Sequence, residues 1–325
     1  MRPRLFLLLS LVAASTVSFL FTGHSANHWP LAQIDPYALN ILVLMGINIL
    51  LAVSLNLVNG HAGQFSLGHA GFMAIGAYSS SFLTLSLQKH PALATLPFRD
   101  PLLFAAALLL AGLLAALAGL AVGIPSLRLR GDYLAIVTLG FGEIIRVVIQ
   151  NAEALGGARG LTGIPPLTSL GWTFAMAALA IYTVGSLVQS SFGRGFLAVR
   201  DDEIAAEAMG IPTTRYKVLA FVLGAFFAGI AGALYAHFIG FIAPEGFNFL
   251  KSVDIVVMVI IGGMGSTAGV TIAAALLTLL NELLRQTEQY RMIVFALLLI
   301  VMMILRPQGL LGDLSRWFPK RKDRS

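Results

Sequence analysis

Long apolar stretches recur along this chain, separated by short polar segments, and this alternation limits the folds that it can adopt. Most of them approach the length of about 20 residues that an α-helix needs to cross the hydrocarbon core of a bilayer. Backbone groups inside a bilayer must find hydrogen-bond partners within the protein, and a helix meets this requirement by itself. We therefore expect eight membrane-spanning helices, at residues 1–22, 37–58, 65–87, 102–124, 133–150, 172–190, 218–238 and 292–305.

The composition agrees with a membrane protein that crosses the bilayer many times. Charged residues make up 11% of the chain and hydrophobic residues 58%, whereas a soluble domain carries about 25% charged residues. The chain has no cysteine, which excludes disulfides, thiolate metal sites and cysteine nucleophiles. Its net charge of +6 comes from basic residues spread over separate loops, a pattern that does not indicate nucleic-acid binding. We expect a single transmembrane domain over residues 1–325.

One further apolar stretch, residues 252–284, is too long for a single straight span at about 1.5 Å per residue. The sequence GGMGS interrupts it at residues 262–266. We expect two short helices, 253–261 and 267–284, that meet at an unwound turn, because non-helical backbone at membrane depth is tolerated inside protein or beside a water-filled cavity. The expected fold class is an all-α polytopic membrane protein with about 8 full spans plus this broken helix, or about 10 segments.

The positive charges indicate which side of the membrane each loop faces. With the N-terminus inside and the broken helix counted as two passes, fourteen of the 21 Lys and Arg residues lie in inside segments. Because inside loops carry an excess of Lys and Arg, this layout places a charged loop, residues 193–217, and a basic tail, residues 306–325, in the cytoplasm. The first apolar stretch also fits a cleaved signal peptide. We expect an uncleaved span there, because many spans follow it.

A short charged segment, RDDEIAAEAMGIP at residues 200–212, stands between two apolar spans. Asp201 or Asp202 can cap a helix, acidic residues in the first turn suit the helix dipole, and Gly210 can end the helix. We expect a helix of about two turns on the membrane surface, where a soluble partner can dock. An ordinary solvated loop helix is the alternative. The candidate coupling residues are Arg200, Asp201, Asp202, Glu203, Ala205, Ala206, Glu207 and Gly210.

Polar side chains gather where the second and third expected spans meet. Buried polar groups in a bilayer are costly and usually face a cavity or a partner helix. They can line or gate a substrate path, although the pattern alone favours a hydrogen-bonded hairpin near the cytoplasmic surface. His61 and His69 have no neighbouring acid, and we expect no metal site. The candidates for a translocation path are Asn56, Asn59, Gln64, Ser66, His69, Glu143, Gly262, Gly263 and Gly265.

The two glycine-containing motifs resemble each other weakly. NGHAGQFSLGHAG begins at residue 59 and IGGMGSTAG at residue 261, which suggests corresponding positions in two halves. An energy source is not evident in this chain, because a nucleotide-binding P-loop needs a lysine directly after a glycine, and none of the lysines has one. If ATP drives the protein, the ATPase is another polypeptide.

Several blocks of sequence resemble the LivM-type permease subunits of branched-chain amino acid ABC importers. The segment GRGFLAVRDDEIAAEAMGI contains a pattern similar to the coupling loop of ABC permeases, in which Glu-Ala-Ala is followed by three residues and then Gly. Here the acid departs from that pattern, because Glu203 stands one position early. The matching blocks are residues 54–78, 130–148, 156–166, 193–211 and 306–312.

The resemblance implies an ABC importer permease fold in the bacterial inner membrane, and a subunit that moves branched-chain or related amino acids into the cytoplasm. It implies a pore shared with a LivH-like second permease, two cytoplasmic ATPase subunits that bind ATP and magnesium, and a periplasmic substrate-binding protein. The chain itself is then no enzyme and needs no cofactor. Urea and short-amide importers have similar permeases, so the substrate stays open. The other alternative is an ion-coupled secondary transporter, which needs an intramembrane acid such as Glu143.

Overall fold

The computed structural model describes residues 35–88, 99–126 and 131–287, together with a few separate positions between 293 and 309. Within these residues, six helices are long and apolar enough to cross a membrane. They agree with six of the eight expected spans and confirm the helical membrane fold. The first expected span and the basic tail lie outside the described residues, and the last expected span lies largely outside them. The six helices are α2 (Pro36–Asn56), α3 (His69–Gln88), α4 (Arg99–Ser126), α5 (Asp132–Asn151), α6 (Leu170–Gln189) and α9 (Thr213–Ile239).

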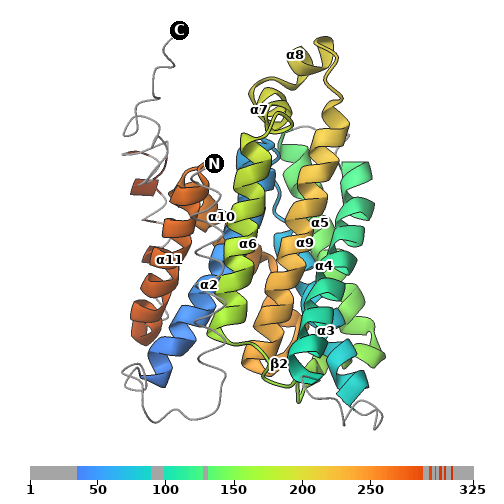
Figure 1. Cartoon of the computed structure of the whole chain (residues 1–325), viewed down its shortest axis with the longest axis vertical. Helices are drawn as coiled ribbons and strands as arrows, with labels where there is room; N and C mark the ends of the chain where they lie inside the picture. Colours follow the sequence, from blue (N-terminus) through green and yellow to red (C-terminus); the bar gives the residue numbers. More distant parts are fainter. Residues whose placement is uncertain are drawn as a thin grey trace.

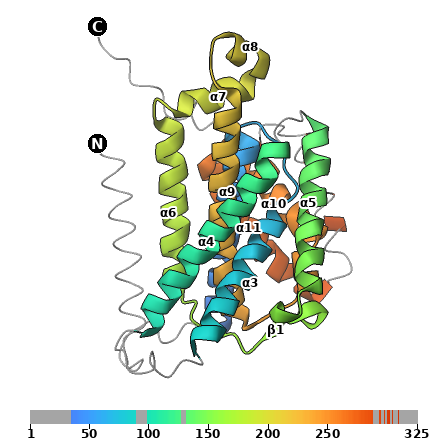
Figure 2. The same ribbon diagram turned by 90° about the vertical axis from the view of Figure 1, so that its right-hand side faces the viewer.

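The six helices form one bundle with shorter elements at its two ends (Figure 1). At one end α7 (Gly193–Asp201) lies across the bundle, and α8 (Glu203–Ala208) extends beyond it (Figure 2). At the other end β1 (Leu161–Thr162) pairs antiparallel with β2 (Phe241–Ile242). Short 3-10 segments lie at η4 (Glu153–Leu155), η5 (Gly157–Arg159), η6 (Pro244–Phe247) and η7 (Leu284–Thr287).

Helix α9 is the centre of the bundle and packs most extensively against α4 and α3. Small residues allow these helices to approach closely, as is usual inside membranes. A methyl group added to Gly232 would lie 1.9 Å from the Met73 carbonyl oxygen, and one added to Gly76 would lie 2.0 Å from the Gly229 carbonyl oxygen. These two glycines therefore allow α3 and α9 to pack closely together.

We expect Gly232→Ala to destabilise the protein by about 1–3 kcal/mol, because the added methyl group must push α3 and α9 apart. Gly185→Ala in α6 is the matched control, since a methyl group there meets nothing within 4 Å. Thermal melting of the two detergent-purified variants measures the difference. Equal melting temperatures would show that the α3–α9 contact is looser than described.

The broken helix is confirmed. Helix α10 (Phe249–Gly262) ends at the glycine-rich turn, and α11 (Thr267–Leu283) begins after it, with the Ser266 side chain accepting a hydrogen bond from the Gly269 N–H at 3.2 Å. A methyl group on Gly262 would lie 2.4 Å from the Val270 Cα, so the two helices fold back on each other as a hairpin. Helix α10 starts four residues earlier than expected, because the Asn248 side chain caps it by accepting from the Lys251 N–H at 3.1 Å.

The region between α2 and α3 differs from its expectation. The chain continues beyond α2 as the π-helical turn η2 (Leu57–His61), and residues 63–68 are irregular although we expected helix from residue 65. Side chains satisfy the backbone here in place of helical hydrogen bonds. The Ser66 N–H donates to Asn59 Oδ1 at 3.1 Å, and the Leu67 N–H donates to Thr138 Oγ1 at 3.1 Å. The sequence pattern contains no signal for such long-range acceptors.

Candidate functional site

Within the charged segment, α8 is the short helix that we expected, and Arg200 and Asp201 belong to the end of α7. Asp202 separates α7 from α8 with an extended backbone, φ −156° and ψ 110°. Its Oδ1 accepts from the Ile204 and Ala205 N–H groups at 2.9 and 3.0 Å. Asp202 is therefore the helix cap that the sequence offered as one of two candidates. Gly210, at φ +79°, follows the end of α8 as expected.

Helix α8 is attached to α9 by an ion pair. Glu203 Oε2 lies 2.5 Å from Lys217 Nζ, and the Lys217 side chain is only 6% exposed. Glu203 therefore contacts the bundle and does not point to the solvent with the rest of the acidic segment. We expected Lys217 only as a charge in a cytoplasmic loop, and nothing in the sequence pattern signals its burial.

The opposite side of α8 is apolar and faces solvent. Ile204 is 67% exposed and Met209 is 81% exposed, and Ala205 and Ala208 are exposed between them. We call these four residues the apolar face of α8. Exposed apolar residues on a helix outside the membrane indicate an interaction surface. Ile204 and Met209 were not among the predicted coupling residues, although two large apolar residues within a charged segment were a visible signal.

Helix α7 is held on the end of the bundle by an aromatic cluster. Its buried Phe196 packs edge-on against Tyr216 of α9, with ring centroids 5.4 Å apart, and Phe192 stacks on the same tyrosine at 4.5 Å. A methyl group on Gly195 would lie 2.3 Å from the Tyr216 ring. This packing attaches α7 to α9, and the Glu203–Lys217 pair attaches α8 to the same helix.

Two breaks in the helices meet below α7. We call residues 56–63 and 262–267 the broken-helix junction. The Gly265 N–H donates to Asn56 Oδ1 at 2.9 Å, and His61 Nε2 lies 3.4 Å from Thr267 Oγ1. A methyl group on Gly60 would lie 2.2 Å from the Gly265 nitrogen. The two glycine-containing motifs that resemble each other in sequence are therefore in direct contact.

The other polar candidates are buried around this junction. Asn59 bonds to the backbone of Ser66, and His69 Nε2 lies 2.8 Å from Ser54 Oγ. Gln64 is 3% exposed. Among the described residues no group hydrogen-bonds to the side-chain amide of Gln64. The structure thus brings most of the candidate path residues together, mainly as a hydrogen-bonded hairpin, which the pattern alone favoured.

Glu143 is not part of this cluster. Its Oε2 lies 2.7 Å from Arg146 Nε on the same face of α5, and both side chains are partly exposed. Helix α5 is the least buried of the six spans, and it lies at the edge of the bundle in Figure 2. An ion pair on a membrane helix requires protein or water beside it, because charges are costly in hydrocarbon.

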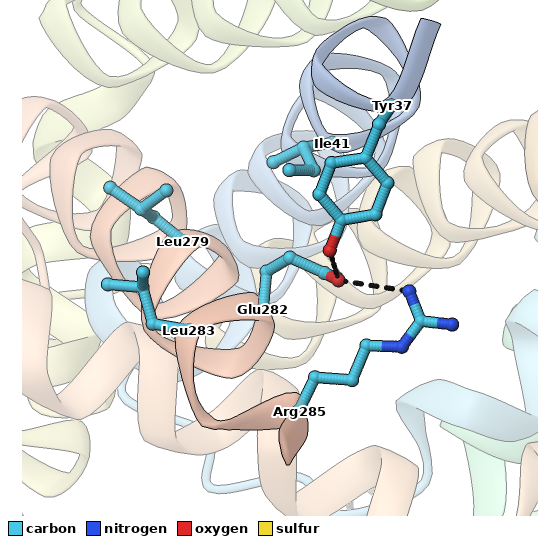
Figure 3. A pocket seen from close by; sticks show the side chains of 6 residues that line it. All are labelled: Tyr37, Ile41, Leu279, Glu282, Leu283 and Arg285. Atoms are coloured by element: carbon cyan, nitrogen blue, oxygen red, sulfur yellow. Dashed lines mark hydrogen bonds and ion pairs between the residues drawn. The ribbon is translucent and has the colours of Figure 1, made fainter. Parts of the chain in front are cut away.

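A separate pocket lies at the other end of α2 and α11 (Figure 3). Its volume is about 600 Å³. The Glu282 carboxylate in this pocket accepts a hydrogen bond from the Tyr37 hydroxyl and another, at 3.2 Å, from Arg285 Nη1. This hydrogen bond raises the pKa of the Arg285 guanidinium. Within the described part of the chain, no group of three His, Asp or Glu side chains could hold a metal ion. The pocket is lined by Tyr37, Ile41, Leu279, Glu282, Leu283 and Arg285.

These features define a class of protein: a multi-pass membrane protein whose broken helices meet beneath two short helices at one end of the bundle. Residues 37–304 match the model of a family described as "Branched-chain amino acid transport system / permease component". The chain belongs to this family, which confirms the resemblance seen in the sequence.

Individual relatives agree with this assignment. The chain is similar to the high-affinity branched-chain amino acid transport system permease protein LivM of Salmonella typhimurium, at 39% identity over 74% of this chain and 62% of the relative. It is 24% identical to the probable LivM of Methanocaldococcus jannaschii over 71% of this chain and 76% of that protein. LivH of Escherichia coli is 34% identical over 42% of this chain and 44% of LivH.

The chain spans less than two thirds of the length of the Salmonella LivM protein that it matches. No solved structure matches the chain.

Proposed function

We propose that this chain is a membrane-spanning subunit of an ABC importer that moves branched-chain amino acids into the cytoplasm. The observation that carries the proposal is the apolar face of α8, held rigidly outside the membrane and joined through α7 to the broken-helix junction. Family membership supports it. ATP and magnesium are then bound by separate ATPase subunits, and the apolar face of α8 is where one of them docks.

The proposed mechanism follows from how the helices are attached. Closure of the ATPase pair pushes on α8, whose Glu203 is anchored to Lys217 of α9 at 2.5 Å. The push reaches the spans through α9 and through α7, which the Tyr216 aromatic cluster fixes in place. These helices tilt and open the path to alternate sides of the membrane. In this arrangement α8 is cytoplasmic, the C-terminus is cytoplasmic and the membrane is the bacterial inner membrane.

The partners are inferred from chemistry and from the family. The partly exposed Glu143–Arg146 pair on α5 needs protein or water beside it, and we assign this side of α5 to a LivH-like second permease and the path between the two chains. A periplasmic binding protein delivers the substrate and selects it. Because the binding protein selects the substrate, the sequences of the spans need not distinguish branched-chain amino acids from urea or short amides.

Glu143→Gln distinguishes this proposal from an ion-coupled secondary transporter. The Glu143 carboxylate is already paired with Arg146 at 2.7 Å, so we expect ATP-driven uptake to change by no more than about threefold when its charge is removed. A transporter that relays protons through Glu143 would lose uptake completely. Initial uptake rates in liposomes at matched protein levels decide between the two.

Purification from native membranes in mild detergent tests the proposed assembly. We expect a second permease and soluble ATPases to purify with this chain. Recovery of the chain alone, with transport driven by an ion gradient and without ATP, would overturn the proposal.

A further inference from the structure

Arg200, in the last turn of α7, lies directly on the first of the two helix breaks. A methyl group added to Gly63 would lie 2.9 Å from the Arg200 Cγ and 3.0 Å from its Cα. Gly63 has φ +68°, a conformation that glycine adopts without strain. The stem of Arg200 therefore occupies the space that a side chain at residue 63 would need.

The guanidinium of Arg200 reaches the second break. A methyl group on Gly265, whose φ is +88°, would lie 3.2 Å from Arg200 Nη1. The other two guanidinium nitrogens, Nε and Nη2, donate to Asp201 Oδ1 at 3.1 and 2.9 Å, which orients the fork. One side chain of the surface helix pair thus contacts both breaks at glycines that leave room for it.

The junction and the adjoining Gln64 contain unsatisfied polar groups. Among the described residues, no hydrogen-bond partner exists for Nδ1 of His61 or for either amide atom of Gln64, although both side chains are buried. Leaving buried polar groups unpaired is unfavourable, and these atoms lose no hydrogen bond if the region rearranges. Coupling between distant sites requires such a rearrangement.

We propose that Arg200 is the positioning residue that transmits movement of the α7–α8 pair to the broken-helix junction. This inference rests on the proposed function and adds a specific connection to it. When α7 moves, Arg200 displaces Gly63 and Gly265 together, because the two breaks are already joined by the hydrogen bond from the Gly265 N–H to Asn56. Without the Arg200 side chain, α7 can move while the junction stays in place.

The test is the ratio of substrate transported to ATP hydrolysed by the purified complex in liposomes. We expect Arg200→Ala to keep its ATPase subunits and most of its ATP hydrolysis, and to lower the ratio about tenfold, a coupling of typical size. Arg200→Lys retains the aliphatic stem on Gly63 but not the guanidinium beside Gly265. Its ratio of transport to ATP hydrolysis is therefore expected to lie between those of the wild type and Arg200→Ala. Arg194→Ala is the matched control, because Arg194 is exposed on the first turn of the same helix.

Each outcome decides the inference. An unchanged ratio in Arg200→Ala overturns it, and if that variant does not assemble, an unchanged ratio in Arg200→Lys does the same. A purely structural role would lower the amount of assembled complex and leave the ratio of the assembled fraction unchanged, which also overturns the inference. Failure of the proposed function is distinct, because the wild-type chain would then purify without ATPases.

Discussion

Met209→Asp and Ile204→Asp are each expected to abolish transport while the protein remains folded in the membrane. Both side chains are largely exposed on the apolar face of α8, so a carboxylate there does not disturb the bundle. In a complex the same carboxylate must be buried against an apolar surface of the ATPase. Central interface residues contribute about 2 kcal/mol or more, so we expect roughly thirtyfold weaker ATPase binding.

Co-purification of ATPase subunits with each variant measures this effect, with thermal melting as the check on folding. Ser191→Asp is the control, because it adds the same charge at an exposed position just before α7. Docking on this face is excluded if both α8 variants retain their ATPase subunits at the wild-type ratio.

Lys217→Met is expected to destabilise the α8 attachment more than any surface substitution in the charged segment. The change leaves Glu203 beside the apolar environment that buries Lys217, and breaking a buried ion pair costs about 3–5 kcal/mol. We expect α8 to detach from α9, with a lower melting temperature and faster proteolysis between α7 and α9. Glu203→Lys is also expected to detach α8, because it places a second ammonium group beside that of Lys217.

The double exchange Glu203→Lys with Lys217→Glu provides the matched control, since it restores the pair with its polarity reversed. We expect it to recover part of the lost stability. Limited proteolysis and melting curves measure all three proteins. If Lys217→Met is as stable as wild type and α8 as resistant to protease, the ion pair does not hold α8.

Sequence patterns predicted the features that depend on local chemistry. Six spans are fixed by their apolar length, and the broken helix is fixed by the glycine-rich turn at residues 262–266. Asp202 was one of two candidate caps, and the structure selects it because its carboxylate reaches two free N–H groups. The weak resemblance of the two glycine-containing motifs did not indicate that they touch.

The remaining features depend on contacts between distant residues. The irregular segment before α3 requires Thr138, 71 positions away, as an acceptor for the Leu67 N–H. The pocket in Figure 3 joins Tyr37 to Glu282 across 245 positions. The Glu203–Lys217 pair depends on how α8 folds back onto α9. Periodicity and composition describe one element at a time, so they cannot show which side chain another element will bring near.

Uptake of labelled leucine into liposomes tests the central claim most directly. The liposomes carry the complex purified through this chain, with its binding protein added, and the reactions compare ATP with a non-hydrolysable analogue. We predict that uptake requires ATP hydrolysis and the binding protein. Unlabelled isoleucine or valine should compete with the labelled leucine, and urea should have no effect. Leucine uptake by this chain alone, driven by an ion gradient without ATP, would contradict the account.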